Sequence, residues 1–237
     1  MLLVCGYPKT GNTWLQVILS YIVNPKVSLD GTAPPLPNIF THAMPNYNHA
    51  SYSEQKIVVD DIKTVRCVLL IRHPGDTLVS LYMHNRYREK VPLYTGSIDD
   101  MVYDPVYGIK KYLIFYQWWH DNIEQTELYC IVRYEDMLVD TYTQIVNVLK
   151  TFKAKVPNQH IYNAIQFGNF NNMKRMEKTN FLKKWSPMKA SHNPSVNAMK
   201  IREGKSGNYI HRFQPSTITY IHEKMKSLPE RYRYSLK

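Results

Sequence analysis

The chain has 237 residues, 44% of them hydrophobic, which is enough for one folded domain with a sizeable core and argues against disorder. Thirty Lys and Arg against 19 Asp and Glu give a formal net charge of +11, so the surface attracts nucleic acid, an anionic membrane or a small polyanion. No run of 18 apolar residues predicts a membrane span, and the N-terminus lacks the features of a signal peptide.

The first elements predict the opening of a parallel sheet. Leu2–Gly6 is a short apolar run, as in a buried strand, and Thr13–Val23 is a helix that is apolar nearly all round. Residues 26–50 carry four prolines and are expected to form a loop or lid. Strand, glycine-containing loop and helix in this order favour an α/β fold: a single domain over residues 1–237, with a central parallel sheet flanked by helices.

The same periodicities predict the remaining elements in chain order. Two further strands are expected, at 65–71 and 127–132. Residues 174–205 are basic and poorly periodic. Each of the three cysteines, Cys5, Cys67 and Cys130, falls in a predicted strand, so we expect buried, reduced residues of a cytoplasmic protein. The predicted helices are 53–61, 76–86, 106–122, 141–152, 160–166 and 215–225.

The loop between the first strand and its helix has the GxxxxG spacing of a phosphate-binding loop, from Gly6 to Gly11. A Walker A motif needs Lys directly after the second Gly, but Asn12 stands there and the lysine is Lys9. No apolar strand ends in the Asp expected to hold magnesium, and the second strand runs into Arg72. The pattern therefore indicates a phosphate-bearing ligand held by lysine and arginine rather than by a metal. A purely structural turn is the alternative.

The sequence from Tyr7 to Trp14, YPKTGNTW, resembles the YPKSGTTW loop of the cytosolic sulfotransferases, which use 3′-phosphoadenosine-5′-phosphosulfate (PAPS). The resemblance implies that the lysine neutralises the bridging oxygen as it leaves and that the following residues contact the 5′-phosphate. It also implies that the tryptophan packs on the adenine. The implied donor-binding residues of this loop are Lys9, Thr10, Gly11, Asn12, Thr13 and Trp14.

Two further segments resemble the same family. Arg72–Tyr82 is similar to its RNPxDxxVSxY segment, which implies that Arg72 and Ser80 bind the 3′-phosphate; a surface salt bridge to Asp76 is the alternative for the arginine. Tyr134 opens a YEDM sequence like the family's, which implies a tyrosine beside the adenine.

A segment near the C-terminus, Arg202–Tyr209, resembles the family's RKGxxGDW clamp over the 3′-phosphate. Arg202 and Gly204 match, whereas Glu203 replaces a lysine, and its carboxylate is expected to weaken phosphate binding. Lys205 is expected to compensate for that charge.

Transfer to a hydroxyl needs a general base, and histidine suits this role because its pKa lies near operating pH. The segment Thr41–Pro45 resembles the family's KTHLP, which implies that His42 is the base, with His49 as the competitor and Phe40 in place of the usual lysine. The expected catalytic set is His42, Lys9 and Ser80, with in-line transfer and no metal.

The resemblance implies sulfuryl transfer from PAPS to a hydroxyl or amine of a small-molecule acceptor, without nucleic acid or membrane as a partner. Acceptor identity and oligomeric state stay open. A P-loop nucleoside or nucleotide kinase is one alternative, and it predicts dependence on magnesium. A basic nucleic-acid-binding module is the other, and it predicts a clustered basic face with interleaved aromatic residues.

Overall fold

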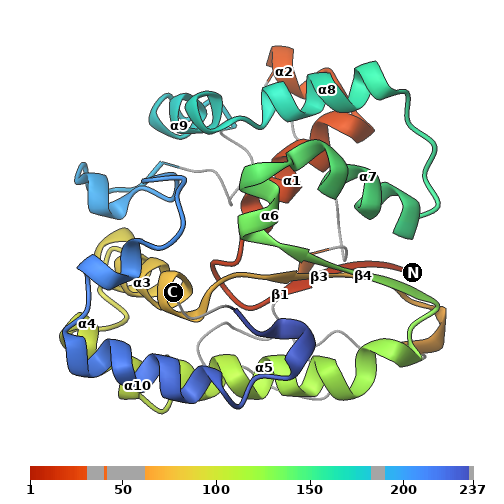
Figure 1. Cartoon of the computed structure of the whole chain (residues 1–237). Helices are drawn as coiled ribbons and strands as arrows, with labels where there is room; N and C mark the ends of the chain where they lie inside the picture. The colour runs from red at the N-terminus through yellow and green to blue at the C-terminus, as the bar shows by residue number, and fades with distance from the viewer. Residues whose placement is uncertain (31–39, 42–61, 183–189, 235–237) are drawn as a thin grey trace.

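Four parallel strands form the central sheet of the computed structural model, which describes residues 1–30, 40–41, 62–182 and 190–234 (Figure 1). The sheet order is β2-β1-β3-β4, so the chain moves to one side of β1 for β2 and to the other side for β3. A crevice therefore opens between β1 and β3 at the carboxyl ends of the strands. The strands are β1 (Leu2–Gly6), β2 (Phe40–Thr41), β3 (Arg66–Ile71) and β4 (Leu128–Arg133).

Helices cover both faces of this sheet (Figure 1). One face carries α3 (Pro74–Met83), α4 (Ile98–Tyr103), α5 (Ile109–Asn122) and α10 (Pro215–Met225). The other carries α1 (Asn12–Val23), α6 (Tyr134–Val139), α7 (Thr141–Thr151) and α8 (Asn158–Phe167). Beyond α1 lie α2 (Val27–Asp30) and α9 (Phe170–Lys178). A π-helix (His84–Arg88) extends α3, and short 3₁₀ helices lie at 62–64, 123–125, 196–198, 208–211 and 230–232.

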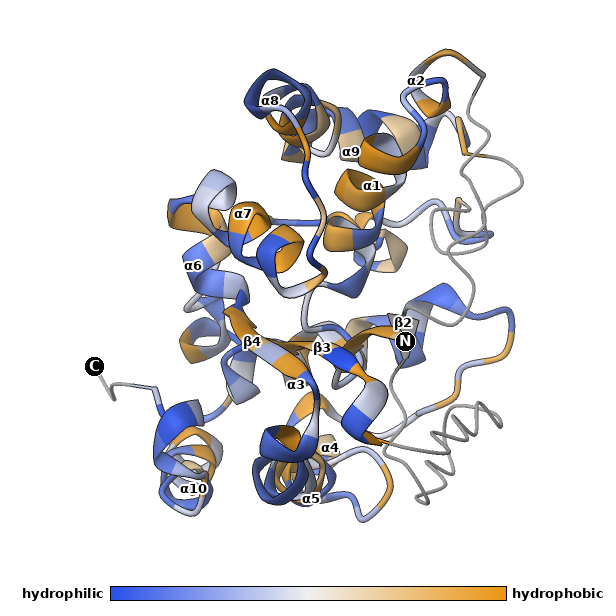
Figure 2. Cartoon of the chain, turned by 90° about the vertical axis from the view of Figure 1, so that its right-hand side faces the viewer, coloured by the Kyte–Doolittle hydropathy of each residue, from blue (hydrophilic) through white to orange (hydrophobic). Residues whose placement is uncertain are grey.

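The alternation of side chains along each strand divides the core into two layers. On one face, Leu69 and its neighbours pack against the aromatic residues of α5, among them Tyr112, Phe115 and Trp119. On the other, Val68 and Leu70 pack against Ile18 and residues of α7 and α8. Figure 2 shows the hydrophobic strands between helices whose outer faces are hydrophilic. Burial on both faces is the reason that these strands read as continuous apolar runs rather than as alternating ones.

The predicted α/β fold with a central parallel sheet is confirmed, and the three predicted strands are present within one residue of their expected bounds. The helix expected at 215–225 is present with those bounds. The helix expected at 76–86 is wrong at both ends, because Pro74 opens it and its α-helical part ends at Met83. The one expected at 106–122 begins only at Ile109, after the extended Gly108.

Four expectations were wrong or reach beyond the described residues. Residues 26–50 are not all loop, since they contain α2 and β2. The basic segment 174–205 begins inside α9, whose buried Met173, Met176 and Glu177 follow helical spacing. Cys130 is half-buried, not buried, because β4 is the last strand of the sheet, whereas Cys5 and Cys67 are buried. The helix predicted at 53–61 lies outside the described residues.

Candidate active site

A cavity of about 260 Å³ lies where the topology predicts a crevice, beyond the carboxyl ends of β1 and β3. Its walls come from segments far apart in the sequence: the loop after β1 with the start of α1, the start and end of α3, two residues of α6, one end of α9 and several residues between 197 and 212. The cavity lining includes every predicted donor-site residue except Thr10, namely Lys9, Gly11, Asn12, Thr13, Trp14, Arg72, Ser80, Tyr134, Arg202, Gly204 and Lys205.

The loop after β1 is held in a tight turn that directs it toward the cavity. Thr10 is buried and donates its hydroxyl to the carbonyl of Tyr7 at 2.7 Å, so its side chain supports the loop from behind. Gly11 has φ 113°, a conformation that a side chain would strain, and it precedes the first residue of α1. Lys9 adopts φ 75°, which is unusual for a residue with a side chain. The N-terminus of α1 thus faces the cavity and favours an anion there.

Arg72 leaves the end of β3 and joins three parts of the cavity wall. Its guanidinium donates to the carbonyl of Lys9 at 3.3 Å and to that of Lys205 at 3.4 Å, and its Cζ lies 4.2 Å from the ring centroid of Tyr134. Ser80 lies on α3, buried but lining the same cavity. Arg72 and Ser80, which were expected to bind the same anion, therefore line the same cavity.

Asp76 has a structural role that the sequence did not reveal. The salt bridge considered for Arg72 is not the arrangement found, because the buried Asp76 carboxylate accepts from the main chain instead. It accepts from the amides of Gly207 at 2.7 Å and Tyr209 at 3.1 Å, and from the Ser206 hydroxyl at 3.1 Å. One carboxylate on α3 therefore fixes the C-terminal segment that closes the cavity.

We expect Asp76→Asn to lower the free energy of unfolding by about 2–3 kcal/mol, because charge-assisted bonds become neutral ones and one buried donor loses its partner. The corresponding drop in melting temperature is roughly 5–10 °C, measurable by differential scanning fluorimetry. Glu223→Gln, at an exposed position of α10, is the control and is expected to change little. An equal, small effect of both substitutions would contradict the role given to Asp76.

The segment 202–205 reaches the cavity through a backbone that requires glycine. Gly204 has φ 61°, and a Cβ there would lie 2.4 Å from the Phe170 ring. Arg202 donates to the carbonyl of Met199 at 3.3 Å, whereas the Lys205 side chain is exposed at the rim. Glu203, the acidic departure from the family pattern, forms an ion pair with Arg212 at 2.7 Å. The carboxylate of Glu203 is therefore paired with Arg212, which also lines the cavity.

Aromatic residues line the part of the cavity next to the helix starts. Trp14 and Tyr134 meet edge to face, with ring centroids 5.7 Å apart. Phe170, 36% exposed, also lines the cavity. Three rings around an opening can hold a planar base by stacking.

Positive charge is concentrated around Lys9. Burial, and then the charges of Lys200, Arg202 and Arg88, lower its pKa well below the usual lysine value, and the charge of Glu177 opposes this. Burial, together with the charge of Arg88, lowers the pKa of Lys200 to about 8. Burial and Arg72 lower the pKa of Arg202 to about 10. Depressed pKa values in a cluster of cations indicate a site prepared for an anion.

Several cavity residues were missed in the sequence, among them His84 and Lys200. His84 stands four residues after Ser80, so the helical spacing could have indicated that both face the cavity. Lys200 had no comparable signal, because it lies in an irregular segment. Burial and then Lys9 lower the pKa of His84 to about 2, so its imidazole is neutral at physiological pH.

His42, the predicted general base, lies outside the described residues. The structure shows the backbone that leads to it: β2 pairs with β1, with Thr41 opposite Cys5. His49, its competitor, also lies outside the described residues.

The comparisons with known proteins agree on one family. A family model described as the sulfotransferase domain matches residues 1–233. The chain is 23% identical to flavonol 4′-sulfotransferase of Flaveria chlorifolia, over 89% of this chain and 73% of that protein. It is also 23% identical to sulfotransferase 1 family member D1 of Rattus norvegicus, over 90% and 77%.

Solved structures share the fold at low sequence identity. Retinol dehydratase, solved in complex with androsterone and the inactive cofactor PAP, superimposes with a TM-score of 0.70 at 17% identity, over 99% of this chain and 82% of that one. A mouse sulfotransferase complexed with PAP gives 0.69 at 18% identity, over 96% and 83%. None of the described helices is long and apolar enough to cross a membrane.

Proposed function

Because the chain belongs to the sulfotransferase domain family, we propose that it transfers a sulfuryl group from PAPS to a hydroxyl or amine of a small-molecule acceptor. The observation that carries this proposal is the convergence of two anion-binding elements on one cavity, the loop at Lys9 and the strand end at Arg72. We further propose that residues 1–237 act as a single domain in the cytoplasm.

The donor is proposed to lie with its base among the rings of Trp14, Tyr134 and Phe170. Its 3′-phosphate would meet Arg72, Ser80, Arg202, Gly204 and Lys205, and its 5′-phosphosulfate would meet the loop from Lys9 to Thr13. The position of Arg72 supports this orientation. Its guanidinium donates to the main-chain carbonyl of Lys205 and to that of Lys9, so it lies between the two phosphate-binding segments. Retinol dehydratase and the mouse sulfotransferase, which share the fold, were both solved with PAP.

The proposed chemistry is an in-line transfer without a metal. The acceptor oxygen or nitrogen attacks sulfur, His42 takes the acceptor proton, and the bond between sulfur and the bridging oxygen breaks. Lys9 and the loop amides stabilise the negative charge that grows on that oxygen. The short strand Phe40–Thr41, paired to β1 immediately before the Lys9 loop, supports His42 as the base.

The first experiment measures the thermal stabilisation of the protein by 3′,5′-adenosine bisphosphate (PAP), with ADP and magnesium-ATP as comparisons. A ligand at a hundred times its Kd adds about 2.7 kcal/mol, which is roughly 5–10 °C in melting temperature for a chain of this size. We expect a shift with PAP and little with ADP, which lacks the 3′-phosphate. Formation of a sulfated product from PAPS and a phenolic acceptor then tests transfer.

A shift with magnesium-ATP and none with PAP would overturn the proposal in favour of the kinase. The sequence already disfavours that outcome, because Asn12 occupies the position of the Walker lysine. The family match favours neither the kinase nor the nucleic-acid-binding module.

A further inference from the structure

The peptide group between Arg72 and His73 is held from both faces of the sheet. Its carbonyl, which belongs to Arg72, accepts from the hydroxyl of Tyr112 on α5 at 2.6 Å. Its N–H, which belongs to His73, donates to the carboxylate of Glu135 on α6 at 3.0 Å. The two groups of a trans peptide point in opposite directions, so their partners come from helices on opposite faces (Figure 1). Because the peptide group is planar, these two bonds fix the direction in which the chain leaves Arg72.

The guanidinium of Arg72 is held as well as its main chain. It lies against the ring of Tyr134, the residue directly before Glu135, with its Cζ 4.2 Å from the ring centroid. It donates to the carbonyls of Lys9 and Lys205, which are neutral acceptors and do not cancel its positive charge. A guanidinium recognises phosphate through forked donors, so these bonds depend on its orientation. A guanidinium that is oriented before the ligand arrives loses less entropy on binding.

Glu135 also links Arg72 to the C-terminal segment that closes the cavity. The hydroxyl of Ser206 lies 3.3 Å from Glu135 and 3.1 Å from Asp76, so its single hydrogen is shared between two carboxylates. The other oxygen of Glu135 accepts from the hydroxyl of Tyr234 at 3.1 Å. Burial and the charge of Glu135 raise the pKa of Tyr234, so this hydroxyl keeps its proton and remains a donor. One carboxylate therefore joins the end of β3, the closing segment and Tyr234.

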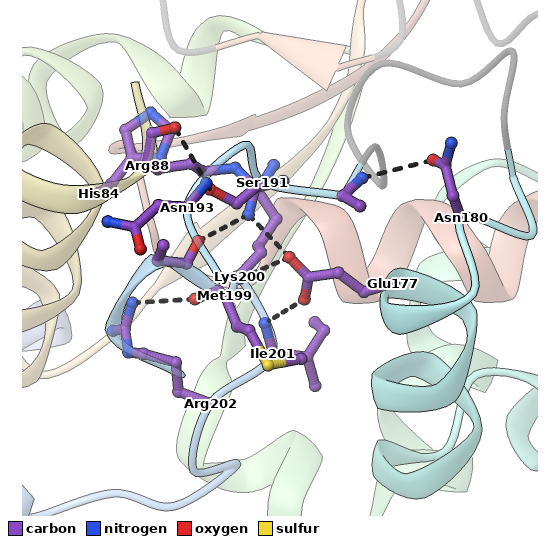
Figure 3. A network of polar contacts seen from close by, with 12 residues as sticks. His84, Arg88, Glu177, Asn180, Ser191, Asn193, Met199, Lys200, Ile201 and Arg202 are labelled. Carbon is purple, nitrogen blue, oxygen red and sulfur yellow. Dashed lines mark hydrogen bonds and ion pairs between the residues drawn. The ribbon is translucent and has the colours of Figure 1, made fainter. Parts of the chain in front are cut away.

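The closing segment has a separate anchor at its start. Glu177, on α9, has a side chain that is 2% exposed. It accepts from the amide of Lys200 at 2.7 Å and from that of Ile201 at 2.9 Å (Figure 3). The main chain directly before Arg202 is therefore fixed by bonds that do not involve Glu135. Replacing Glu135 is expected to leave this anchor in place and to disturb the end of β3.

We propose that Glu135 and Tyr112 are positioning residues that give the site its preference for a ligand with a 3′-phosphate, because they hold the peptide group after Arg72. This inference rests on the proposed function. Neither residue is among the described residues that line the cavity, so both act through Arg72. The charge of Glu135 by itself has the opposite effect, since a carboxylate disfavours a phosphate nearby. Positioning and charge therefore predict opposite results when Glu135 is removed.

The test measures dissociation constants for PAP and for adenosine 5′-monophosphate (AMP), which differ only in the 3′-phosphate. Their ratio on one preparation is not changed by a loss of folded protein. We expect Glu135→Ala to lower the preference for PAP about tenfold. Glu135→Gln should lower it by about twofold or less, because an amide still accepts from the N–H of His73 and can donate to Tyr234. Asp136→Ala is the control, since it removes an exposed carboxylate from the same turn and should leave the ratio unchanged.

Tyr112→Phe tests the other end of the same peptide group, because it removes only the hydroxyl that bonds to Arg72. We expect the preference for PAP to fall about threefold. Tyr162→Phe, at a tyrosine of α8 that is 51% exposed, is the matched control and should have no effect. In the Arg72→Ala background, Glu135→Ala should change the ratio by about twofold or less, because the residue that it positions is gone.

An unchanged preference in Glu135→Ala or in Tyr112→Phe would overturn the inference, because a role in stability alone weakens both ligands equally. A higher preference in Glu135→Ala would overturn it in favour of charge repulsion. A loss that persists in full in the Arg72→Ala background would overturn the action through Arg72. If Glu135→Ala does not fold, Tyr112→Phe decides by the same criterion. Wild-type protein without a preference for PAP over AMP would overturn the proposed function itself, which no result on the variants alone can do.

Discussion

Replacing Lys9 by Met is expected to lower kcat by about 10²–10³-fold while changing the affinity for PAP only a few-fold. The reason is that charge on the bridging oxygen grows during transfer, so the cation beside it stabilises the transition state more than the bound donor. The structure places Lys9 in the cavity wall, at the turn between β1 and α1, where neighbouring cations already disfavour its charge. Initial rates with PAPS and a phenolic acceptor that the wild type sulfates give kcat.

The same substitution is expected to stabilise the free protein or leave its stability unchanged. A lysine whose pKa is lowered by burial and by other cations is less stable as an ion in the folded chain than in the unfolded one, so its removal relieves that cost at neutral pH. Lys9→Gly is the matched variant, because glycine also relieves the left-handed φ of 75°. It should melt above Lys9→Met and be equally slow in catalysis.

A normal kcat in Lys9→Met, or a loss of rate explained entirely by weaker PAP binding, would contradict a transition-state role for Lys9. Loss of activity together with a lower melting temperature would instead indicate that the side chain supports the loop. The two variants separate these outcomes because they share the lost ammonium and differ in the backbone.

Replacing Arg72 by Ala is expected to weaken PAP binding by roughly 10–150-fold, which corresponds to the 1.5–3 kcal/mol of a charge-assisted hydrogen bond. ADP binding should change far less, because ADP lacks the 3′-phosphate that Arg72 is proposed to bind. The expected result is therefore a loss of the preference for PAP over ADP, read from dissociation constants for both ligands. Arg72→Lys should restore only part of it, because an ammonium lacks the forked donors of guanidinium.

Arg72 also bonds to two main-chain carbonyls, so a structural effect has to be separated from a ligand effect. Arg86→Ala is the control, since that arginine likewise donates to a carbonyl, at 3.1 Å, but stands outside the cavity lining. Similar losses of melting temperature are expected for both variants, with the loss of PAP preference confined to Arg72→Ala. Equal weakening of PAP and ADP would contradict the assignment of Arg72 to the 3′-phosphate.

Local chemistry in the sequence was enough to predict the β1 strand, the Lys9 loop and α1 in their correct order. An apolar run that ends at Gly6, a loop containing Gly11 and an apolar stretch ended by Pro25 each determine their own backbone. Pro215 determined the start of α10 in the same way. Because parallel strands direct the ends of β1 and β3 to one edge, the meeting of Lys9 and Arg72 also followed from the sequence.

Tertiary structure alone decided how the C-terminal segment closes the site. Asp76 bonds to amides 131 and 133 residues later, and Arg88 pairs with Glu177 at a separation of 89 residues. No periodicity or turn chemistry encodes such distances. The donors that pair with a buried carboxylate are determined by tertiary packing, and they are required because an unpaired charge in the interior is unstable. The main-chain amide of Lys200 likewise bonds to Glu177, 23 residues earlier, whereas the strand, loop and helix at the start of the chain follow from their own residues.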